Sequence, residues 1–208
     1  MTDTYLELTA DQVLLRDTVA RFIGAELPLE QVRILHDDPR GFDRNWLRRA
    51  AEIGWYSLLV SETDGGGSVS GDGLTDAAVV AEEVGRGLQP GPFVPMNVVA
   101  AAIGRLGSET QRSGTLRAVL AGEAVATWAV ADGAGNWDGG AGVEVSRAGD
   151  SLTVSGTRGY VQDAGSADWF LVPGRLDGRT AGIGEAEELR RLVETFAERV
   201  VDGAADAA

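Results

Sequence analysis

Few residues in this sequence have side chains that can act as nucleophiles, proton shuttles or metal ligands. The 208-residue chain has no cysteine and one histidine, His36, and all 18 of its basic residues are arginine. These absences exclude disulfides, thiolate metal sites, a cysteine nucleophile, a phosphate-binding lysine and a Schiff-base lysine. A Ser-His-Asp triad would have to include His36, and a site with several histidine ligands is excluded.

Three short patterns could still do chemistry, and each has a simpler interpretation. His36 could be a base held by Asp37, but a solvated loop histidine is the interpretation that we favour. Gly65–Gly67 could cradle phosphate, yet no lysine or strand supports this, so we expect a flexible loop. Glu82 and Glu83 are adjacent on a predicted helix and point in different directions, which favours a surface role. We therefore assign no catalytic residue and no metal site.

Two tryptophans, Trp128 and Trp137, stand in the part of the chain that is expected to form strands. They could line the binding site of a planar cofactor, or they could fill a β core. The sequence leaves both interpretations open.

Charge and hydropathy limit the partners and the location. The formal net charge is −14, which is the wrong sign for binding a nucleic-acid backbone or an anionic membrane surface. The first residues include Asp3 and Glu7 and lack the basic and apolar regions of a signal peptide. No apolar run is long enough to span a bilayer. We therefore predict a cytoplasmic protein that has neither nucleic-acid nor membrane partners.

Helices that could position these residues are expected in the first 122 residues. Thr9 and Gln12 have the spacing of a capping box at the start of one helix. Asp43 can cap a second helix, which Gly54 ends. Apolar residues at helical spacing predict further helices at 74–85, 98–106 and 110–121, and prolines mark 90–95 as an extended connector.

The periodicity changes after Gly122, where short β-prone segments alternate with turns rich in glycine and aspartate. Strands are predicted at 125–130, 143–146, 151–154 and 169–172, with a hairpin turn at 148–150. One amphipathic helix is predicted at 185–201. The fold class is therefore α+β: an N-terminal all-α domain (1–122), a partial antiparallel β-barrel-like domain (123–178), and a linker with one C-terminal helix (179–208).

Several segments, in this order, resemble the acyl-CoA dehydrogenase family. The matching segments are Leu47–Trp55, Glu62–Gly66, Ala81–Arg86, Gly107–Gln111, Leu120–Glu123, Ser155–Tyr160 and Ala167–Val172. The resemblance covers roughly residues 5–175. It implies a helical domain and a β domain that covers one face of FAD. In the family, a glutamate in a third domain removes the α-proton of an acyl-CoA, and the flavin takes a hydride from the β-carbon.

The resemblance also implies where FAD and substrate would be held. The family loop Thr-Glu-Pro-x-Ala-Gly-Ser-Asp falls on Ala131–Asp138, so Ala131 replaces a hydroxyl that contacts flavin and Trp137 replaces the serine that meets the acyl-CoA. The family segment Trp-Ile-Thr becomes Tyr160-Val-Gln162. The cofactor-binding residues implied by the resemblance are Trp128, Val130, Ala131, Tyr160 and Gln162, and Trp137 is the implied substrate contact.

The sequence has no counterpart of the family's third domain, so we expect this chain alone to be inactive and to bind FAD weakly or not at all. Two hypotheses follow. In one, the chain is a subunit that acts on an acyl-CoA, such as a fatty or steroid side-chain thioester, together with a full-length acyl-CoA dehydrogenase subunit. In the other, it is a truncated, non-catalytic remnant or an interaction module.

Overall fold

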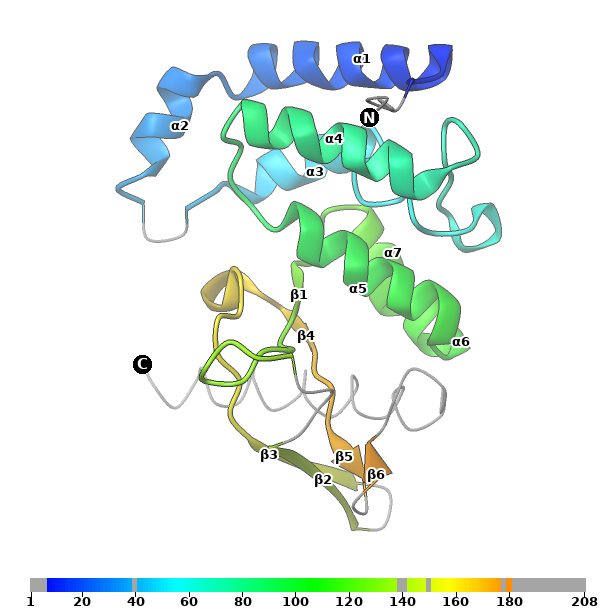
Figure 1. The fold of residues 1–208 in the computed structure, drawn as a ribbon, viewed down its shortest axis with the longest axis vertical. Helices are drawn as coiled ribbons and strands as arrows, with labels where there is room; N and C mark the ends of the chain where they lie inside the picture. Colours follow the sequence, from blue (N-terminus) through cyan, green and yellow to red (C-terminus); the bar gives the residue numbers. More distant parts are fainter. Residues whose placement is uncertain (1–6, 39–40, 138–141, 149–150, 177–178, 181–208) are drawn as a thin grey trace, which may run out of the picture.

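The computed structural model describes residues 7–38, 41–137, 142–148, 151–176 and 179–180. Its helical part precedes its strand part, which confirms the α+β organisation. Figure 1 shows α1 lying along α4 at one end of the molecule, the strands at the other end, and α5 between them. The helices of the described residues are α1 (Ala10–Glu26), α2 (Leu29–Leu35), α3 (Arg44–Glu52), α4 (Gly73–Arg86), α5 (Phe93–Leu106), α6 (Glu109–Gln111) and α7 (Arg117–Leu120).

Local capping signals explain where several helices begin and end. The Thr9 hydroxyl accepts a hydrogen bond from the backbone N of Gln12, and the Gln12 side chain accepts one from the backbone N of Thr9, so the predicted capping box is present. Asp43 caps α3 through the backbone N of Asn45. Gly54 follows the end of α3 with a φ of +83°, a left-handed conformation that favours glycine.

The prediction of an extended connector through Pro95 was wrong in its second half. Pro92 is the N-cap of α5, and Pro95 lies within the first turn of the helix. The backbone N of a residue in the first turn has no partner inside the helix, so proline costs nothing there. The predicted helix at 110–121 is also divided, because a π-helical turn (Arg112–Leu116) separates α6 from α7.

An aromatic cluster forms the centre of the helical part. Phe22 stacks on Trp46, and Trp55 packs edge-on against Phe22, Trp46 and Phe93, with ring centroids 5.2–5.9 Å apart. The indole N–H of Trp46 donates to the carbonyl of Pro90. Such rings bury large apolar areas and hold α1, α3 and α5 in fixed positions.

The strands form two small sheets with mixed pairing. They are β1 (Ala126–Trp128), β2 (Val143–Ala148), β3 (Ser151–Gly156), β4 (Trp169–Leu171), β5 (Arg175–Leu176) and β6 (Arg179–Thr180). β2 pairs antiparallel with β3, as the predicted hairpin requires, and β5 pairs antiparallel with β6. β1 pairs parallel with β4, and β2 pairs parallel with β5. The predicted antiparallel pairing therefore holds for two pairs of strands and not for the other two, since long connections allow neighbouring strands to run the same way.

The structure also bears on membrane spans, on metal-binding groups and on the last predicted helix. In the part of the chain that the structure describes, no helix combines the length and apolar character required to cross a bilayer. No group of three or more His, Asp or Glu residues that could hold a metal ion occurs among those same residues. The predicted helix at 185–201 lies outside the described residues.

Candidate functional site

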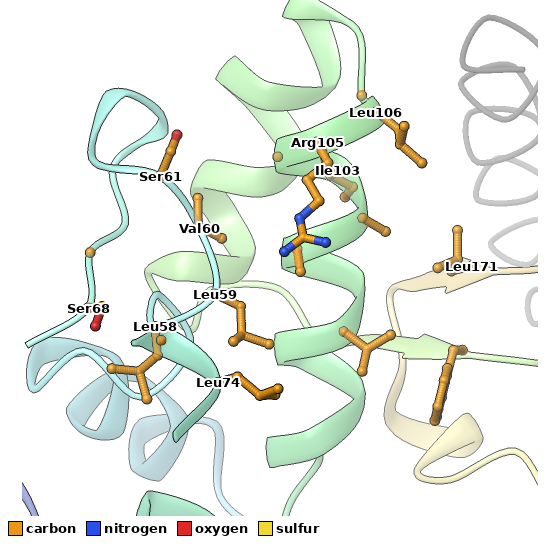
Figure 2. A pocket seen from close by; sticks show the side chains of 18 of the residues that line it. Leu58, Leu59, Val60, Ser61, Ser68, Leu74, Ile103, Arg105, Leu106 and Leu171 are labelled. Carbon is orange, nitrogen blue, oxygen red and sulfur yellow. The ribbon is translucent and has the colours of Figure 1, made fainter. Parts of the chain in front are cut away.

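An apolar pocket of about 1400 Å³ opens at the junction of the helical part and the strand part. Its walls come from three stretches that are far apart in the sequence: residues 58–74, residues 98–111 of α5 and the following turn, and residues 128–173 of the strand part. Figure 2 shows Leu58, Leu59 and Leu74 facing α5 across the pocket, with Leu171 on the strand side. We call this cavity the junction pocket.

The first wall depends on two glycines that allow close backbone packing. A Cβ on Gly66 would lie 2.4 Å from the carbonyl oxygen of Val60, and a Cβ on Gly73 would lie 2.1 Å from that of Leu58. Any side chain at either position would force the segment away from residues 58–60. The expectation of a flexible glycine loop at 65–67 is therefore wrong, because the loop is tightly packed and Gly66 is required by contact.

Asp76 stabilises the same wall through a buried network of hydrogen bonds. Its carboxylate is fully buried near the start of α4 and accepts five hydrogen bonds. The donors are Gln12 Nε2, Ser68 Oγ, Val69 N, Ser70 N and Ser70 Oγ, at 2.6–3.2 Å. Burial alone would raise the pKa of Asp76, but these hydrogen bonds outweigh it and the pKa is lowered. The ionised carboxylate thus fixes the loop that carries Ser68 at the rim of the pocket.

The second wall is the face of α5 that carries small residues. Ala101, Ala102 and Gly104 line the pocket, and a Cβ on Gly104 would lie 3.5 Å from Val60 Cγ1. Small side chains leave room between α5 and the Leu58–Val60 segment. Arg105, in the last turn of α5, is the one cationic residue among the described residues that line the pocket.

The third wall contains the two tryptophans that the sequence singled out. Trp128 and Trp137 both line the pocket, with ring centroids 5.1 Å apart and planes at 78°, an edge-to-face contact. Trp128 is half-buried, whereas Trp137 is 70% exposed. Trp128 packs against the core, whereas Trp137 is too exposed to fill one, and the cofactor-binding interpretation of the pair stays a prediction.

The structure brings together only some of the six residues implied by the resemblance. Trp128, Val130 and Trp137 line the junction pocket. Ala131, Tyr160 and Gln162 do not line it, although they lie on the two neighbouring segments 131–137 and 158–162. The backbone N of Gly159 donates to the carbonyl of Ala131 and so joins the two segments. The hydroxyl of Thr127 in β1 donates to the carbonyl of Gln162 and ties the second segment to that strand.

The loop that carries Ala131 satisfies its own polar groups. Ala131 is buried and forms an isolated β-bridge with Trp137. The Asp132 carboxylate accepts hydrogen bonds from the backbone N of Ala134 and from the backbone and side chain of Asn136. Hydrogen bonds from Asn136 are the main reason that the pKa of Asp132 is lowered. This carboxylate is committed to the loop and is not poised as a base.

The remaining sequence candidates lie away from the junction pocket. His36 is exposed and borders a second, smaller cavity of about 540 Å³ beside α2. Glu82 and Glu83 both form ion pairs with Arg86 on α4. Neither arrangement places a base beside the junction pocket. His36 and Glu82 are exposed, as expected, but the surface interpretation is wrong for Glu83, which is buried with its carboxylate paired to Arg86.

Sequence reasoning missed Asp76 and Arg105. An aspartate in the first turn of a helix is common, so Asp76 carries no special signal in the sequence. The groups that donate hydrogen bonds to its carboxylate come together only when the 68–70 loop folds over it. Arg105 carried a usable signal, because it is the single charged residue in the mostly apolar segment 93–106.

The chain thus consists of helices followed by a small mixed β part, with a large apolar pocket between them. A family model described as "Acyl-CoA dehydrogenase, N-terminal domain" matches residues 9–123. The chain therefore belongs to the acyl-CoA dehydrogenase family.

Individual relatives agree with this assignment. The acyl-CoA dehydrogenase IpdE2 of Mycolicibacterium smegmatis is 33% identical over 97 residues, which are 46% of this chain and 30% of that protein. The structure of the ChsE4-ChsE5 complex from Mycobacterium tuberculosis matches with a TM-score of 0.73 and 27% identity, over 84% of this chain and 46% of that chain. A variant of the Tcur3481-Tcur3483 steroid ACAD matches with a TM-score of 0.70 and 26% identity, over 80% and 45%. This chain thus spans less than half the length of these relatives.

Proposed function

We propose that this chain is one subunit of a heteromeric acyl-CoA dehydrogenase that desaturates a bulky acyl-CoA thioester. In this proposal the chain forms one wall of the acyl-CoA site, and a full-length acyl-CoA dehydrogenase subunit supplies the base and most of the FAD site. The observation that carries the proposal is the junction pocket, whose apolar walls meet at the edge of the strand part. The division into domains at 1–122, 123–178 and 179–208 belongs to the same proposal.

The chemistry of the junction pocket suits an acyl chain. Its volume of about 1400 Å³ exceeds the range of roughly 300–1,000 Å³ that is usual for small-molecule pockets. Leucine, valine and alanine side chains dominate its helical walls, and each methylene that they bury contributes about 0.8 kcal/mol. A ligand with a large hydrocarbon body, such as a steroid side chain, gains most from such a site. Two of the similar structures are a steroid ACAD and a two-component complex, which supports this substrate class and a heteromer.

The described residues do not by themselves form an FAD site. Trp128 and Trp137 offer aromatic surface in the pocket, but Ala131 has no hydroxyl and its carbonyl already accepts from Gly159. Tyr160 is 79% exposed and packs against Gly135, outside the pocket. In the family FAD supplies the electron sink of the reaction. Here the proposal assigns its binding mainly to the partner, with Trp128, Val130, Ala131, Tyr160 and Gln162 as a contributing surface.

The carboxylates at the junction pocket give no reason to place the base in the described part of this chain. Glu62 and Asp72 are its acidic lining residues, and both are exposed. Asp72 accepts hydrogen bonds from the hydroxyl and backbone N of Thr75, which lower its pKa. A base that removes the α-proton of a thioester works best with a pKa near neutrality. The proposal therefore assigns the base to the partner subunit.

A non-catalytic interaction module is the second candidate, and one observation favours it. Leu74 and Trp137 both line the pocket and are 73% and 70% exposed. Uncovered apolar surface often marks a protein interface. A module of this kind would cover the pocket with a partner and would contribute no acyl-CoA contact.

Purification through a tag on this chain, from the cells that encode it, separates the two candidates. The proposal predicts a yellow complex that contains a full-length acyl-CoA dehydrogenase subunit and shows flavin absorbance near 450 nm. Acyl-CoA should bind this complex, and a substitution that fills the junction pocket should weaken binding without dissociating the subunits. A colourless lone chain would support the non-catalytic candidate. A complex whose affinity for acyl-CoA is unchanged by a substitution that fills the pocket would support it as well.

A further inference from the structure

Arg105 places a positive charge at a pocket whose lining is otherwise mostly apolar. It belongs to the last turn of α5, and Figure 2 shows its side chain projecting from the helix toward the space beside the Leu58–Val60 segment. Its neighbours along the helix, Ala101, Ala102 and Leu106, also line the pocket. The guanidinium is therefore accessible to whatever occupies the cavity.

This guanidinium has no hydrogen-bond or ion-pair partner among the described residues. Several other arginines of the helical part have partners: Arg44 pairs with Asp168, Arg86 with Glu82 and Glu83, and Arg112 with Asp64 and Glu109. Two acidic residues, Glu62 and Asp72, line the same pocket, yet neither forms an ion pair with Arg105. Asp72 is instead engaged with Thr75.

The hydrogen bonds at the C-terminal end of α5 do not involve the Arg105 side chain either. A cation in the last turn of a helix can interact with the terminal carbonyl groups. At this helix end the carbonyl of Ile103 accepts from the backbone N of Gly107, and the carbonyl of Gly107 accepts from Arg112. These two carbonyl groups have partners other than Arg105, so its guanidinium remains available for a ligand.

We propose that the junction pocket binds a ligand that combines an apolar body with an anionic group, and that Arg105 binds this group. Guanidinium groups bind carboxylate and phosphate oxygens through charge-assisted hydrogen bonds. The inference rests on the proposed function for the identity of the ligand as an acyl-CoA. The anion is then a carboxylate on the acyl chain or a phosphate of coenzyme A, and Arg105 determines specificity for it.

Titration calorimetry on the full 208-residue chain tests the proposal with five probes. Decanoate and decanol share an apolar chain and differ in charge. Octanoyl-CoA and 7-carboxyheptanoyl-CoA share a thioester and a chain length and differ in a terminal carboxylate, and coenzyme A carries the phosphates alone. The variants are Arg105→Gln, Arg105→Lys and a matched control, Arg117→Gln, which removes an exposed arginine of α7 that does not line the pocket.

The proposal predicts that the unmodified chain binds decanoate about 1.4-fold to fivefold more tightly than decanol, the range expected for a solvent-accessible charge pair worth about 0.2–1 kcal/mol. Arg105→Gln should abolish this preference, whereas Arg105→Lys and Arg117→Gln should retain most of it. Among the coenzyme A probes, a loss confined to 7-carboxyheptanoyl-CoA identifies an acyl carboxylate. An equal loss for coenzyme A and both thioesters identifies a phosphate.

Other outcomes separate this inference from the proposed function. If both thioesters bind and Arg105→Gln changes no affinity, the inference is overturned and the proposed function stands. If neither thioester binds but the decanoate preference depends on Arg105, the anion-binding role of Arg105 stands and the identification of its ligand as an acyl-CoA fails, whereas the proposed function is tested separately on the complex with the partner. If the chain binds none of the probes, the inference is overturned as well.

Discussion

The guanidinium of Arg44 and the carboxylate of Asp168 form a two-pronged ion pair that joins α3 to the start of β4. Arg44 Nη1 lies 2.7 Å from Asp168 Oδ2, and Nη2 lies 3.0 Å from Oδ1. The same carboxylate accepts a hydrogen bond from the backbone N of Val125, just before β1. One side chain of the strand part thus ties the helical part to both strands beside the junction pocket.

Replacement of Asp168 with asparagine should destabilise the chain more than replacement of Arg44 with glutamine. Both side chains are partly exposed, so the ion pair alone contributes about 0.2–1 kcal/mol, as measured for exposed pairs. Asp168→Asn also weakens the bond to Val125 N, and we expect a total loss of about 1–2 kcal/mol. Urea unfolding of both single variants and the double variant measures this. Additive losses, with no coupling between the two sites, would show that the pair is not formed in solution.

Asp76 should make the stability of the helical part depend on pH in the acidic range. Its pKa is lower in the folded chain than the value of about 4 expected in the unfolded chain, because hydrogen bonds to the ionised form outweigh burial. The stabilisation is therefore complete above about pH 4 and is lost as the pH falls toward the lowered pKa. Asp76→Asn should cost about 2–4 kcal/mol at pH 7 and less at pH 3.

Urea unfolding of the parent chain and Asp76→Asn at pH 7, 4 and 3 provides the measurement. Asp72→Asn is a suitable control, because Asp72 is an exposed cap of α4 with its own lowered pKa and does not hold the 68–70 loop. An equal cost of Asp76→Asn at pH 7 and pH 3 would contradict the assigned ionisation.

The sequence predicted features that depend on near neighbours and missed those that depend on distant ones. Thr9, Asp43 and Gly54 were read correctly, because capping involves residues within four positions of each other. Pro95 misled the prediction, since its tolerance depends on its position within the first turn of α5. The parallel pairing joins Ala126 to Trp169, which are more than 40 residues apart, and the junction pocket joins three separate stretches of the chain. No local pattern encodes either arrangement. Val130 was identified only through the family resemblance, whereas the aromatic side chains of Trp128 and Trp137 had already marked them as candidates.

A bulky residue on α5 should block the junction pocket without unfolding the chain. Ala102 lines the open pocket, so Ala102→Trp can point into empty space, where it would occupy the volume of an acyl chain. We expect the affinity for octanoyl-CoA to fall at least about tenfold, which corresponds to about 1.4 kcal/mol. Ala78→Trp is the control, because Ala78 is exposed on α4 and does not line the pocket. Equal acyl-CoA affinity in both variants and the parent chain would exclude this pocket as the binding site.

The chain on its own should bind FAD more weakly than micromolar. Each missing hydrogen bond, such as the hydroxyl absent at Ala131, is worth about 0.5–1.5 kcal/mol. Stacking on Trp128 or Tyr160 adds about 0.5–1.5 kcal/mol per aromatic contact, which is far below the roughly 8 kcal/mol of a micromolar complex. Fluorescence titration of the purified chain with FAD measures this. Saturable binding tighter than micromolar in the absence of a partner would show that the chain holds the cofactor by itself.

Anaerobic addition of acyl-CoA to the complex purified through this chain tests the central claim most directly. Absorbance near 450 nm reports the oxidised flavin, and the chain alone, mixed with FAD, serves as the reference. The account predicts that an acyl-CoA with a bulky apolar group bleaches the flavin of the complex, that the chain alone gives no bleaching, and that Ala102→Trp in the complex slows bleaching while Ala78→Trp does not. Bleaching by the chain alone, or a flavin complex that no acyl-CoA reduces, would contradict the claim that this chain is a partner-dependent acyl-CoA dehydrogenase subunit.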